Sequence, residues 1–178
     1  MTNDNLSKLL SRNKIDNERF LVECYNSLII SLFEVVVNVL NSDRDLKLRT
    51  RNRLRNSSNK NLTSKNIVKD FTNCELSLDE AEKIKKLLEA YFNKSGKRYD
   101  YGPCIRYQLL QKQKCRCNLC GTDIDLDNSE LDHTIPWVLV GDELGSDNLQ
   151  LLCKDCNRRK SSSASYNLKM FLIKKDNH

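Results

Sequence analysis

The longest apolar segment of the chain runs from Phe20 to Leu40. Its polar residues recur every three or four positions: Glu23, Asn26, Ser27, Ser31, Glu34, Asn38 and Asn41. This spacing forms one polar stripe along a helix whose remaining surface is apolar. We therefore expect a helix from about Asp16 to Leu40, buried on most of its circumference in a core or in a homodimer interface. A membrane span is the less favoured alternative, because Glu23 and Glu34 would be costly inside a bilayer.

Shorter patterns predict further helices on either side of a polar connection. Ser77 and Glu80 form a capping box at the start of an apolar stripe that Gly96 ends. A short helix is expected over about 64–71, and Pro103 is expected to open another one. Residues 1–17 are polar and are expected to be frayed, whereas residues 94–102 are typical of a linker. The linker predicts a division into a helical domain, residues 1–96, and a second domain, residues 97–178.

A basic segment follows the long apolar helix. Arginine alternates with other residues at Arg49, Arg51, Arg53 and Arg55. The alternation fits a strand with one basic face, and it also fits a helix with arginines on several faces. Either form suits a polyanion, so we expect this arm to bind a nucleic-acid backbone. A solvated arm without a function is the alternative.

The composition narrows the class of protein. The 178 residues include only 5 Gly and 2 Pro, which argues against an all-β protein and favours helices. The net charge is a modest +6, from 30 basic and 24 acidic residues. Because residues 1–14 lack the apolar stretch of a signal peptide, we expect a cytoplasmic protein. In a reducing compartment the 8 cysteines are expected to be metal ligands or buried thiols rather than disulfides.

Two cysteine pairs in the C-terminal third predict a metal site. They are Cys117-x-x-Cys120 and Cys153-x-x-Cys156. Each pair can form a tight knuckle that presents two thiolates, and four thiolates close a tetrahedral structural zinc site. Gly121 directly after Cys120 suits the turn of such a knuckle. We therefore expect these four cysteines to hold one Zn²⁺.

Asp132 and His133 lie between the two cysteine pairs. The chain has 2 histidines, and only His133 is internal. Histidine is the residue type suited to accepting and releasing a proton near neutral pH. Asp132 offers the hard oxygen ligand that Mg²⁺ prefers. On a strand the two side chains would point to opposite faces, and both could reach one phosphate only where the strand ends or twists. Pro136 is consistent with such an end.

The order of these motifs resembles the HNH family of nucleases, which have the ββα-metal fold. The resemblance covers about residues 105–163. It rests on the two cysteine pairs together with Asp132-His133-x-x-Pro136, Asn148-Leu-x-x-Leu-Cys153 and Cys156-Asn157-x-x-Lys160. Residues before Lys97 match no family that we can name.

The resemblance implies roles for individual residues. Asp132 and Asn157 would hold a catalytic Mg²⁺ or another divalent cation, and His133 would activate water. Asn148 would brace the loop and orient His133. Basic residues after the second cysteine pair would contact phosphate: Arg158, Arg159 and Lys160. The family often has histidine at position 157, and an amide oxygen there favours a hard cation.

Together these observations predict an α+β, mostly α protein: an N-terminal helical domain followed by a zinc-stabilised ββα-metal nuclease domain. By resemblance it would be a metal-dependent endonuclease acting on double-stranded DNA, of a restriction or phage-defence type, without a small-molecule cofactor or a membrane. It could form a homodimer through the 16–40 helix. One alternative is a catalytically inactive zinc-stabilised nucleic-acid-binding module. Another is a subunit of a larger nuclease complex.

Overall fold

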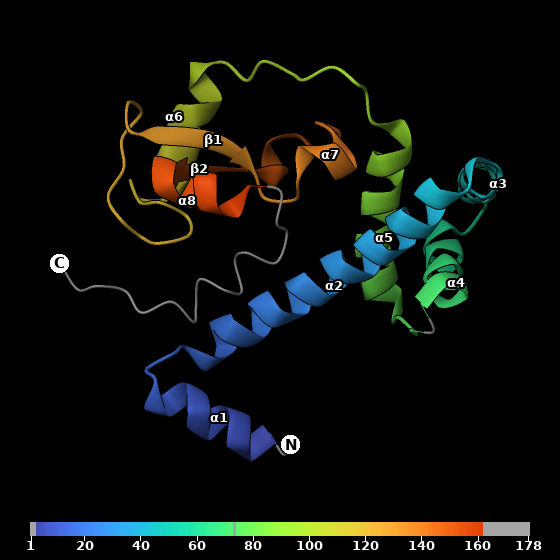
Figure 1. Ribbon diagram of the computed structural model, residues 1–178, viewed down its shortest axis with the longest axis horizontal. Helices are drawn as coiled ribbons and strands as arrows, with labels where there is room; N and C mark the ends of the chain where they lie inside the picture. Colours follow the sequence, from blue (N-terminus) through green and yellow to red (C-terminus); the bar gives the residue numbers. More distant parts are fainter. Residues whose placement is uncertain (1–2, 73, 162–178) are drawn as a thin grey trace.

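The computed structural model describes residues 3–72 and 74–161 of the chain, in a mostly helical arrangement with one small sheet (Figure 1). The elements follow in the order α1 (Asn3–Arg12), α2 (Asn17–Ser42), α3 (Arg44–Arg55), α4 (Lys60–Thr72), α5 (Leu78–Asn93), α6 (Pro103–Lys112), β1 (Ser129–His133), α7 (Trp137–Val140), the short 3₁₀ helix η1 (Gly145–Asn148), β2 (Leu149–Cys153) and α8 (Lys154–Lys160). This content agrees with the predicted α+β, mostly α class.

The helix starts follow local signals in the sequence. Asp16 caps α2, where its side chain accepts a hydrogen bond from Arg19 N at 3.0 Å. Ser77 and Glu80 form the predicted capping box of α5, with Ser77 N donating to Glu80 Oε2 at 2.7 Å and Glu80 N donating to Ser77 Oγ at 3.2 Å. Pro103 opens α6, as expected for a residue that lacks an N–H and has a fixed φ.

One segment differs from its predicted form, and a second adopts one of two forms that the sequence left open. Within the stretch expected to be frayed, α1 forms, and Leu10 is buried. Ile15 N donates to Leu10 O at 3.0 Å, so the chain turns back at the end of this helix. The basic segment is a helix, which is one of the two forms that its arginine alternation fits. Asp43 caps α3 and accepts hydrogen bonds from two backbone N–H groups, and Thr50 and Leu54 form the buried face of the helix.

The larger hydrophobic core lies among α2, α4 and α5. Phe33 and Leu40 of α2 are fully buried in it, as are Ile67 of α4 and Leu88 of α5. Figure 1 shows α2 crossing α5 at an angle, with α3 and α4 gathered at one end of the molecule. Val140 of α7 is also buried in this core, so the loop between the two strands packs against the helical part.

The apolar helix α2 is only partly covered. By length and composition it is the one candidate membrane span found among the described residues, and 22% of its most apolar window is buried. Its C-terminal half supplies core residues such as Phe33 and Val36, which is the position of a core helix. The membrane-free reading and the cytoplasmic location remain predictions.

A second, smaller core lies beneath the sheet. The strands are antiparallel, and the register pairs Ser129 with Cys153 and His133 with Leu149. Leu151 and Leu152 of β2 pack with Leu109 of α6 in this core. The predicted division between residues 96 and 97 falls in the segment that joins α5 to α6, and it remains a prediction.

Candidate active site

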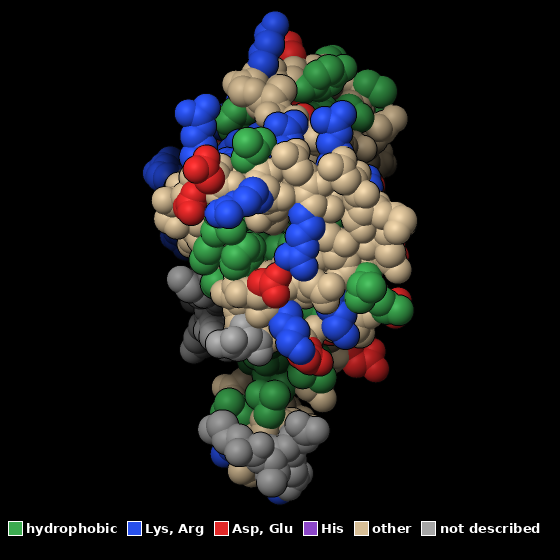
Figure 2. Space-filling model, turned by 90° about the vertical axis from the view of Figure 1, so that its right-hand side faces the viewer, with side chains coloured by type: hydrophobic (Ala, Val, Ile, Leu, Met, Phe, Trp, Pro, Cys, Tyr) green, Lys and Arg blue, Asp and Glu red, His purple; other side chains and the backbone are tan. Residues whose placement is uncertain are grey.

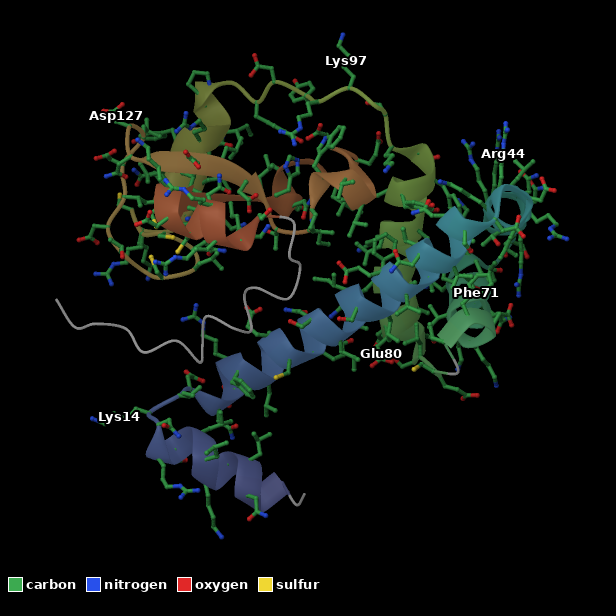
Figure 3. All side chains as sticks on the ribbon, viewed as in Figure 1. Lys14, Arg44, Phe71, Glu80, Lys97 and Asp127 are labelled. Carbon is green, nitrogen blue, oxygen red and sulfur yellow. The ribbon has the colours of Figure 1, made fainter. Side chains whose placement is uncertain are left out.

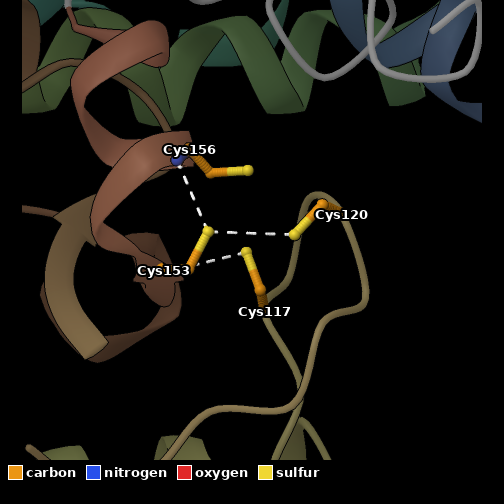
Figure 4. Close-up of side chains that lie close together, drawn as sticks. All are labelled: Cys117, Cys120, Cys153 and Cys156. Atoms are coloured by element: carbon orange, nitrogen blue, oxygen red, sulfur yellow. Dashed lines mark hydrogen bonds between the residues drawn. The ribbon is translucent and has the colours of Figure 1, made fainter. Parts of the chain in front are cut away.

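The four cysteines of the predicted knuckles meet at one point (Figure 4). Cys117 and Cys120 lie in the loop after α6, whereas Cys153 ends β2 and Cys156 lies in α8. All four Sγ atoms lie within 4.8 Å of one another, and Cys120 Sγ is 3.8 Å from Cys153 Sγ. With Zn–S bonds of about 2.3 Å, two ligands of a tetrahedral zinc lie about 3.8 Å apart. The donor set and its spacing therefore fit Zn²⁺.

Backbone groups further shape the knuckles. Cys153 N donates to Cys117 Sγ at 3.3 Å, and Cys156 N donates to Cys153 Sγ at 3.5 Å. Gly121 adopts φ 74° directly after the first knuckle, in the left-handed region that favours glycine. The prediction from Gly121 is thus confirmed. Cys115, two residues before Cys117, lies outside the cluster.

The electrostatics of the cluster also favour a cation. Burial raises the pKa of Cys156, and the neighbouring Cys117 raises it further. Burial likewise raises the pKa of Cys153. At Cys120 burial acts in the same direction, but hydrogen bonds from Thr122 outweigh it and lower the pKa to about 7. Four neighbouring thiolates repel one another, so a divalent cation is needed before all of them ionise.

His133 is the last residue of β1 and lies where the strand leaves the sheet. Its Nε2 is 2.9 Å from Asp142 Oδ1, and its side chain is 17% exposed. The Tyr101 ring packs edge-on against it, with ring centroids 6.4 Å apart. The imidazole is therefore fixed by a carboxylate on one side and by an aromatic ring on another.

Asp142 collects donors from three segments of the chain. Besides His133, Trp137 Nε1 donates to Oδ2 at 2.8 Å and Tyr99 N donates to the same oxygen at 2.9 Å. The Tyr101 hydroxyl also donates to this carboxylate. Burial alone would raise the pKa of Asp142, but these hydrogen bonds outweigh it and lower the pKa to about 2. The group is therefore an anion at neutral pH.

Asp132 faces the opposite side of β1, toward α8. Its Oδ2 accepts from Gln150 Nε2 at 2.9 Å and pairs with Lys160 Nζ at 3.0 Å. Lys160 also donates to His133 O at 2.8 Å, and its side chain is only 1% exposed. Phosphate contact by Lys160 was therefore a wrong expectation, because its ammonium is enclosed and used inside the protein.

Asn157 lies on α8 beside the same face of β1. Its Nδ2 donates to Glu130 Oε2 at 2.6 Å. Because side chains alternate along a strand, Glu130 and Asp132 share the face that packs on α8. Glu130 is half-buried, and its carboxylate lies against α8.

Asn148 closes the loop that follows His133. Its Oδ1 accepts from Ile135 N at 2.8 Å, and its Nδ2 donates to Ile135 O at 3.0 Å. Thr134 N donates to the backbone O of Asn148 at 2.7 Å. The side chain is buried, so this pairing braces residues 134–135 directly after the histidine.

The basic residues lie in two separate places. Arg158 and Arg159 are exposed on α8, whereas the arginines of α3 are exposed at the far end of the helical part (Figure 1). Figure 3 shows Arg44 at the start of α3 directed away from the rest of the molecule. Figure 2 shows Lys and Arg side chains spread over this end. Arg53 differs from its neighbours, since its Nη1 pairs with Asp70 at 2.7 Å.

A family comparison identifies the cysteine-bearing part of the chain. The sequence model of the HNH endonuclease family matches residues 117–163. The chain thus carries an HNH endonuclease domain. Within the described part, the HNH domain contains both cysteine knuckles, β1, β2 and α8. Of the site residues described above, Tyr99, Tyr101 and the arginines of α3 lie outside it.

Two curated proteins are similar in sequence to parts of this chain. Both are described as CRISPR-associated endonuclease Cas9: one from Corynebacterium diphtheriae is 40% identical over 58 residues, and one from Actinomyces naeslundii is 35% identical over 85 residues. The aligned stretches cover 33% and 48% of this chain but only 5% and 8% of the relatives. The chain therefore spans less than a tenth of either relative. No solved structure is significantly similar to it.

The sequence interpretation missed three residues of this site. Asp142, Gln150 and Glu130 each hold a proposed functional side chain through one hydrogen bond. Gln150 had an available signal, because the hairpin register pairs it with Asp132. Asp142 had none, since a loop of irregular structure brings it back to His133.

Proposed function

We propose that this chain is a metal-dependent DNA endonuclease in which His133 takes the proton from the attacking water. The oxygen of this water would attack the phosphorus, and one P–O ester bond would break to give a phosphomonoester and an alcohol. The observation that carries the proposal is the position of His133 within the HNH domain, partly exposed and held by Asp142. A general base must be near the substrate and fixed in orientation.

Asp132 and Asn157 are the proposed ligands of a catalytic divalent cation, Mg²⁺. Both residues lie at the interface of β1 with α8, and they offer the carboxylate and amide oxygens that hard cations take. Asp132 uses only Oδ2 for its described hydrogen bonds and Asn157 uses its amide nitrogen, so each keeps an oxygen for a cation. When bound, the cation would stabilise charge on the phosphate and on the leaving oxygen.

The structural zinc would fix the relative positions of these groups. Cys153 ends β2 and Cys156 precedes Asn157 in α8, so a metal at the knuckles would anchor the helix that carries Asn157. Asn148 would fix the position of His133 in a similar way, because its side chain holds the loop that follows the histidine. We propose Zn²⁺ for this position on the chemistry and spacing of its four thiols.

The arginines of α3 and the pair Arg158 and Arg159 are proposed to contact the phosphate backbone. Side chains of both groups are exposed, and exposed guanidinium groups suit phosphate oxygens. Arg53 contributes less, because Asp70 already partly neutralises it. Double-stranded DNA, a restriction or phage-defence role and a homodimer through α2 are further parts of the proposal.

A plasmid-nicking assay tests the activity. The zinc-loaded protein is incubated with supercoiled plasmid, with and without Mg²⁺, and Mg²⁺ is omitted rather than chelated so that zinc is retained. We expect conversion to open-circular or linear DNA only with Mg²⁺. If the plasmid stays intact although the protein binds it, the inactive nucleic-acid-binding module becomes the better reading. Cleavage of RNA but not DNA would contradict the proposed substrate.

A further inference from the structure

Asp142 lies nine residues after His133 and meets it across a loop. We propose that Asp142 is a positioning residue of the HNH site: its carboxylate holds His133 in the tautomer with hydrogen on Nε2, so that Nδ1 is the atom that accepts the proton of water. The inference rests on the proposed nuclease function for its catalytic consequence. The tautomer itself is a property of the folded chain and can be measured without any cleavage.

The two oxygens of Asp142 have different partners. Oδ2 accepts from Trp137 Nε1 at 2.8 Å and from Tyr99 N at 2.9 Å, so two donors fix its direction. Oδ1 is thereby aimed at His133 Nε2, 2.9 Å away. An ionised carboxylate only accepts hydrogen bonds, and Nε2 must therefore carry the hydrogen between them. In neutral imidazole the other nitrogen, Nδ1, is then unprotonated and basic.

Asp142 is itself held by the segment that joins α5 to α6. Besides Tyr99, Ser95 of this segment donates from its N to Glu143 Oε1 at 3.2 Å, and Lys94 Nζ donates to Val138 O at 2.6 Å. At Gly141, directly before Asp142, an added Cβ would lie 3.0 Å from Lys94 Cβ, and φ is +63°. A glycine is therefore needed where the segment crosses the loop. The position of the carboxylate depends on this close crossing.

A purely structural role is the competing explanation. In that case Asp142 would join the crossing segment to the loop, and its contact with His133 would have no consequence. The two explanations differ in what Asp142→Asn does to the imidazole. The side-chain oxygen of asparagine would satisfy Trp137 Nε1 and Tyr99 N, which both donate, and its amide NH₂ would then face His133 Nε2. A donor at that position requires an unprotonated Nε2, so the hydrogen would move to Nδ1 and the base would be blocked.

The tautomer can be read by NMR on an unusually simple background. The chain has 2 histidines, so His178→Gln leaves His133 as the single imidazole. Long-range ¹H–¹⁵N correlations of the zinc-loaded, Mg²⁺-free full chain at pH 8 would assign its hydrogen. We expect the Nε2–H form with Asp142 and the Nδ1–H form with Asp142→Asn. Asp147→Asn is the matched control, because it makes the same substitution at an exposed residue of the same loop and leaves the His133 contact intact; we expect it to keep the Nε2–H form.

Cleavage kinetics supply the second readout. Asp142→Asn should lower kcat by about a hundred- to ten-thousandfold with little change in KM, because a misplaced tautomer removes the base while substrate binding persists. Asp147→Asn should cut at nearly the rate of the unmodified protein. An Nδ1–H form in the protein with Asp142 intact would overturn the proposal even if the variant failed to fold. So would Asp142→Asn with an unchanged tautomer and kcat. A tautomer change in a protein that never cuts DNA would support the positioning role and reject the nuclease function.

Discussion

Lys160 Nζ lies 3.0 Å from Asp132 Oδ2 and 2.8 Å from the backbone oxygen of His133, and the lysine side chain is 1% exposed. A buried side chain from the C-terminal turn of α8 thus binds the last two residues of β1. The ammonium thus interacts with one carboxylate oxygen and one backbone carbonyl oxygen in the interface between α8 and β1. It also links the two residues that we propose as a metal ligand and as the general base.

Removing this lysine should destabilise the HNH domain strongly. Lys160→Met keeps much of the apolar stem but leaves Asp132 without its cation, and breaking a buried ion pair in this way typically costs about 3–5 kcal/mol. Urea unfolding of the zinc-loaded protein, followed by tryptophan fluorescence, would measure the loss. Arg159→Met is the matched control, since Arg159 is the exposed neighbour. Equal stability of the two variants would contradict the described role of Lys160.

The burial of Lys160 was not predicted from the sequence. Arg158, Arg159 and Lys160 read as one basic run, yet they point in directions about 100° apart on a helix. Lys160 lies four residues after Cys156 and so shares its buried face. The four-residue spacing from Cys156 was therefore enough to predict that Lys160 is buried, whereas the basic run around it suggested an exposed phosphate contact.

Local signals were sufficient elsewhere. The capping box predicted the start of α5, and spacing predicted which cysteines cluster. The contact of His133 with Asp142 could not be predicted, because the intervening residues have no strict period. That contact depends on Gly141 and on the crossing segment at Tyr99. Such tertiary relations arise from packing between segments rather than from a pattern within one.

The four-cysteine cluster predicts that zinc content and folding are linked. Cys153→Ser should lower bound zinc from about one per chain to nearly none and unfold the hairpin, because the metal site supplies much of the folding free energy of a small domain. Elemental analysis and amide NMR spectra would measure both effects. Cys115→Ser is the control, since Cys115 is exposed and lies outside the cluster. A chain without zinc after purification free of chelators would contradict the site.

Zinc uptake should also release protons. Burial and neighbouring thiols raise the pKa values of Cys153 and Cys156, so these groups are protonated in the metal-free protein at neutral pH. Zinc binding requires their thiolate forms, and the affinity should therefore fall as the pH is lowered. Titration of the metal-free protein with Zn²⁺ in a weakly buffered indicator solution at pH 7.5 should show more than one proton released per zinc. A proton count near zero would be inconsistent with thiolate ligation.

His133 is expected to be required for cleavage but not for DNA binding. His133→Ala should lower the single-turnover rate about a hundred- to ten-thousandfold, the usual loss for a general base. Fluorescence anisotropy without Mg²⁺ should give a Kd within about twofold of the unmodified protein, since the exposed arginines carry the backbone contacts. His178→Ala removes the other histidine and serves as the control. If His133→Ala cuts at the full rate, another residue is the base.

The exposed side of α2 predicts self-association. Leu21, Leu28 and Val35 recur at seven-residue spacing and are 48%, 58% and 44% exposed, which is a pattern typical of helices that pair. Leu28→Glu should convert a dimer to a monomer of 20.7 kDa in sedimentation equilibrium. Leu62→Glu on α4, where Leu62 is 46% exposed, should leave the dimer intact. A monomer at all concentrations up to tens of micromolar would reject the interface; a dimer would place two HNH sites on one duplex.

The arginines of α3 are expected to contribute to the salt dependence of DNA binding. Each phosphate contact releases counterions, so losing one lowers the slope of log K against log salt by about one. Replacing Arg49, Arg51 and Arg55 with glutamine should therefore lower the slope by up to about three and weaken binding at low salt. Arg53→Gln alone should change the slope less than Arg51→Gln alone, because Asp70 already pairs with Arg53 at 2.7 Å. Cleavage at saturating DNA should persist in the triple variant, since α3 lies at the opposite end of the molecule from α8 (Figure 1). If the triple variant keeps the full slope, α3 does not contact the backbone, and Arg158 and Arg159 remain as the contacts.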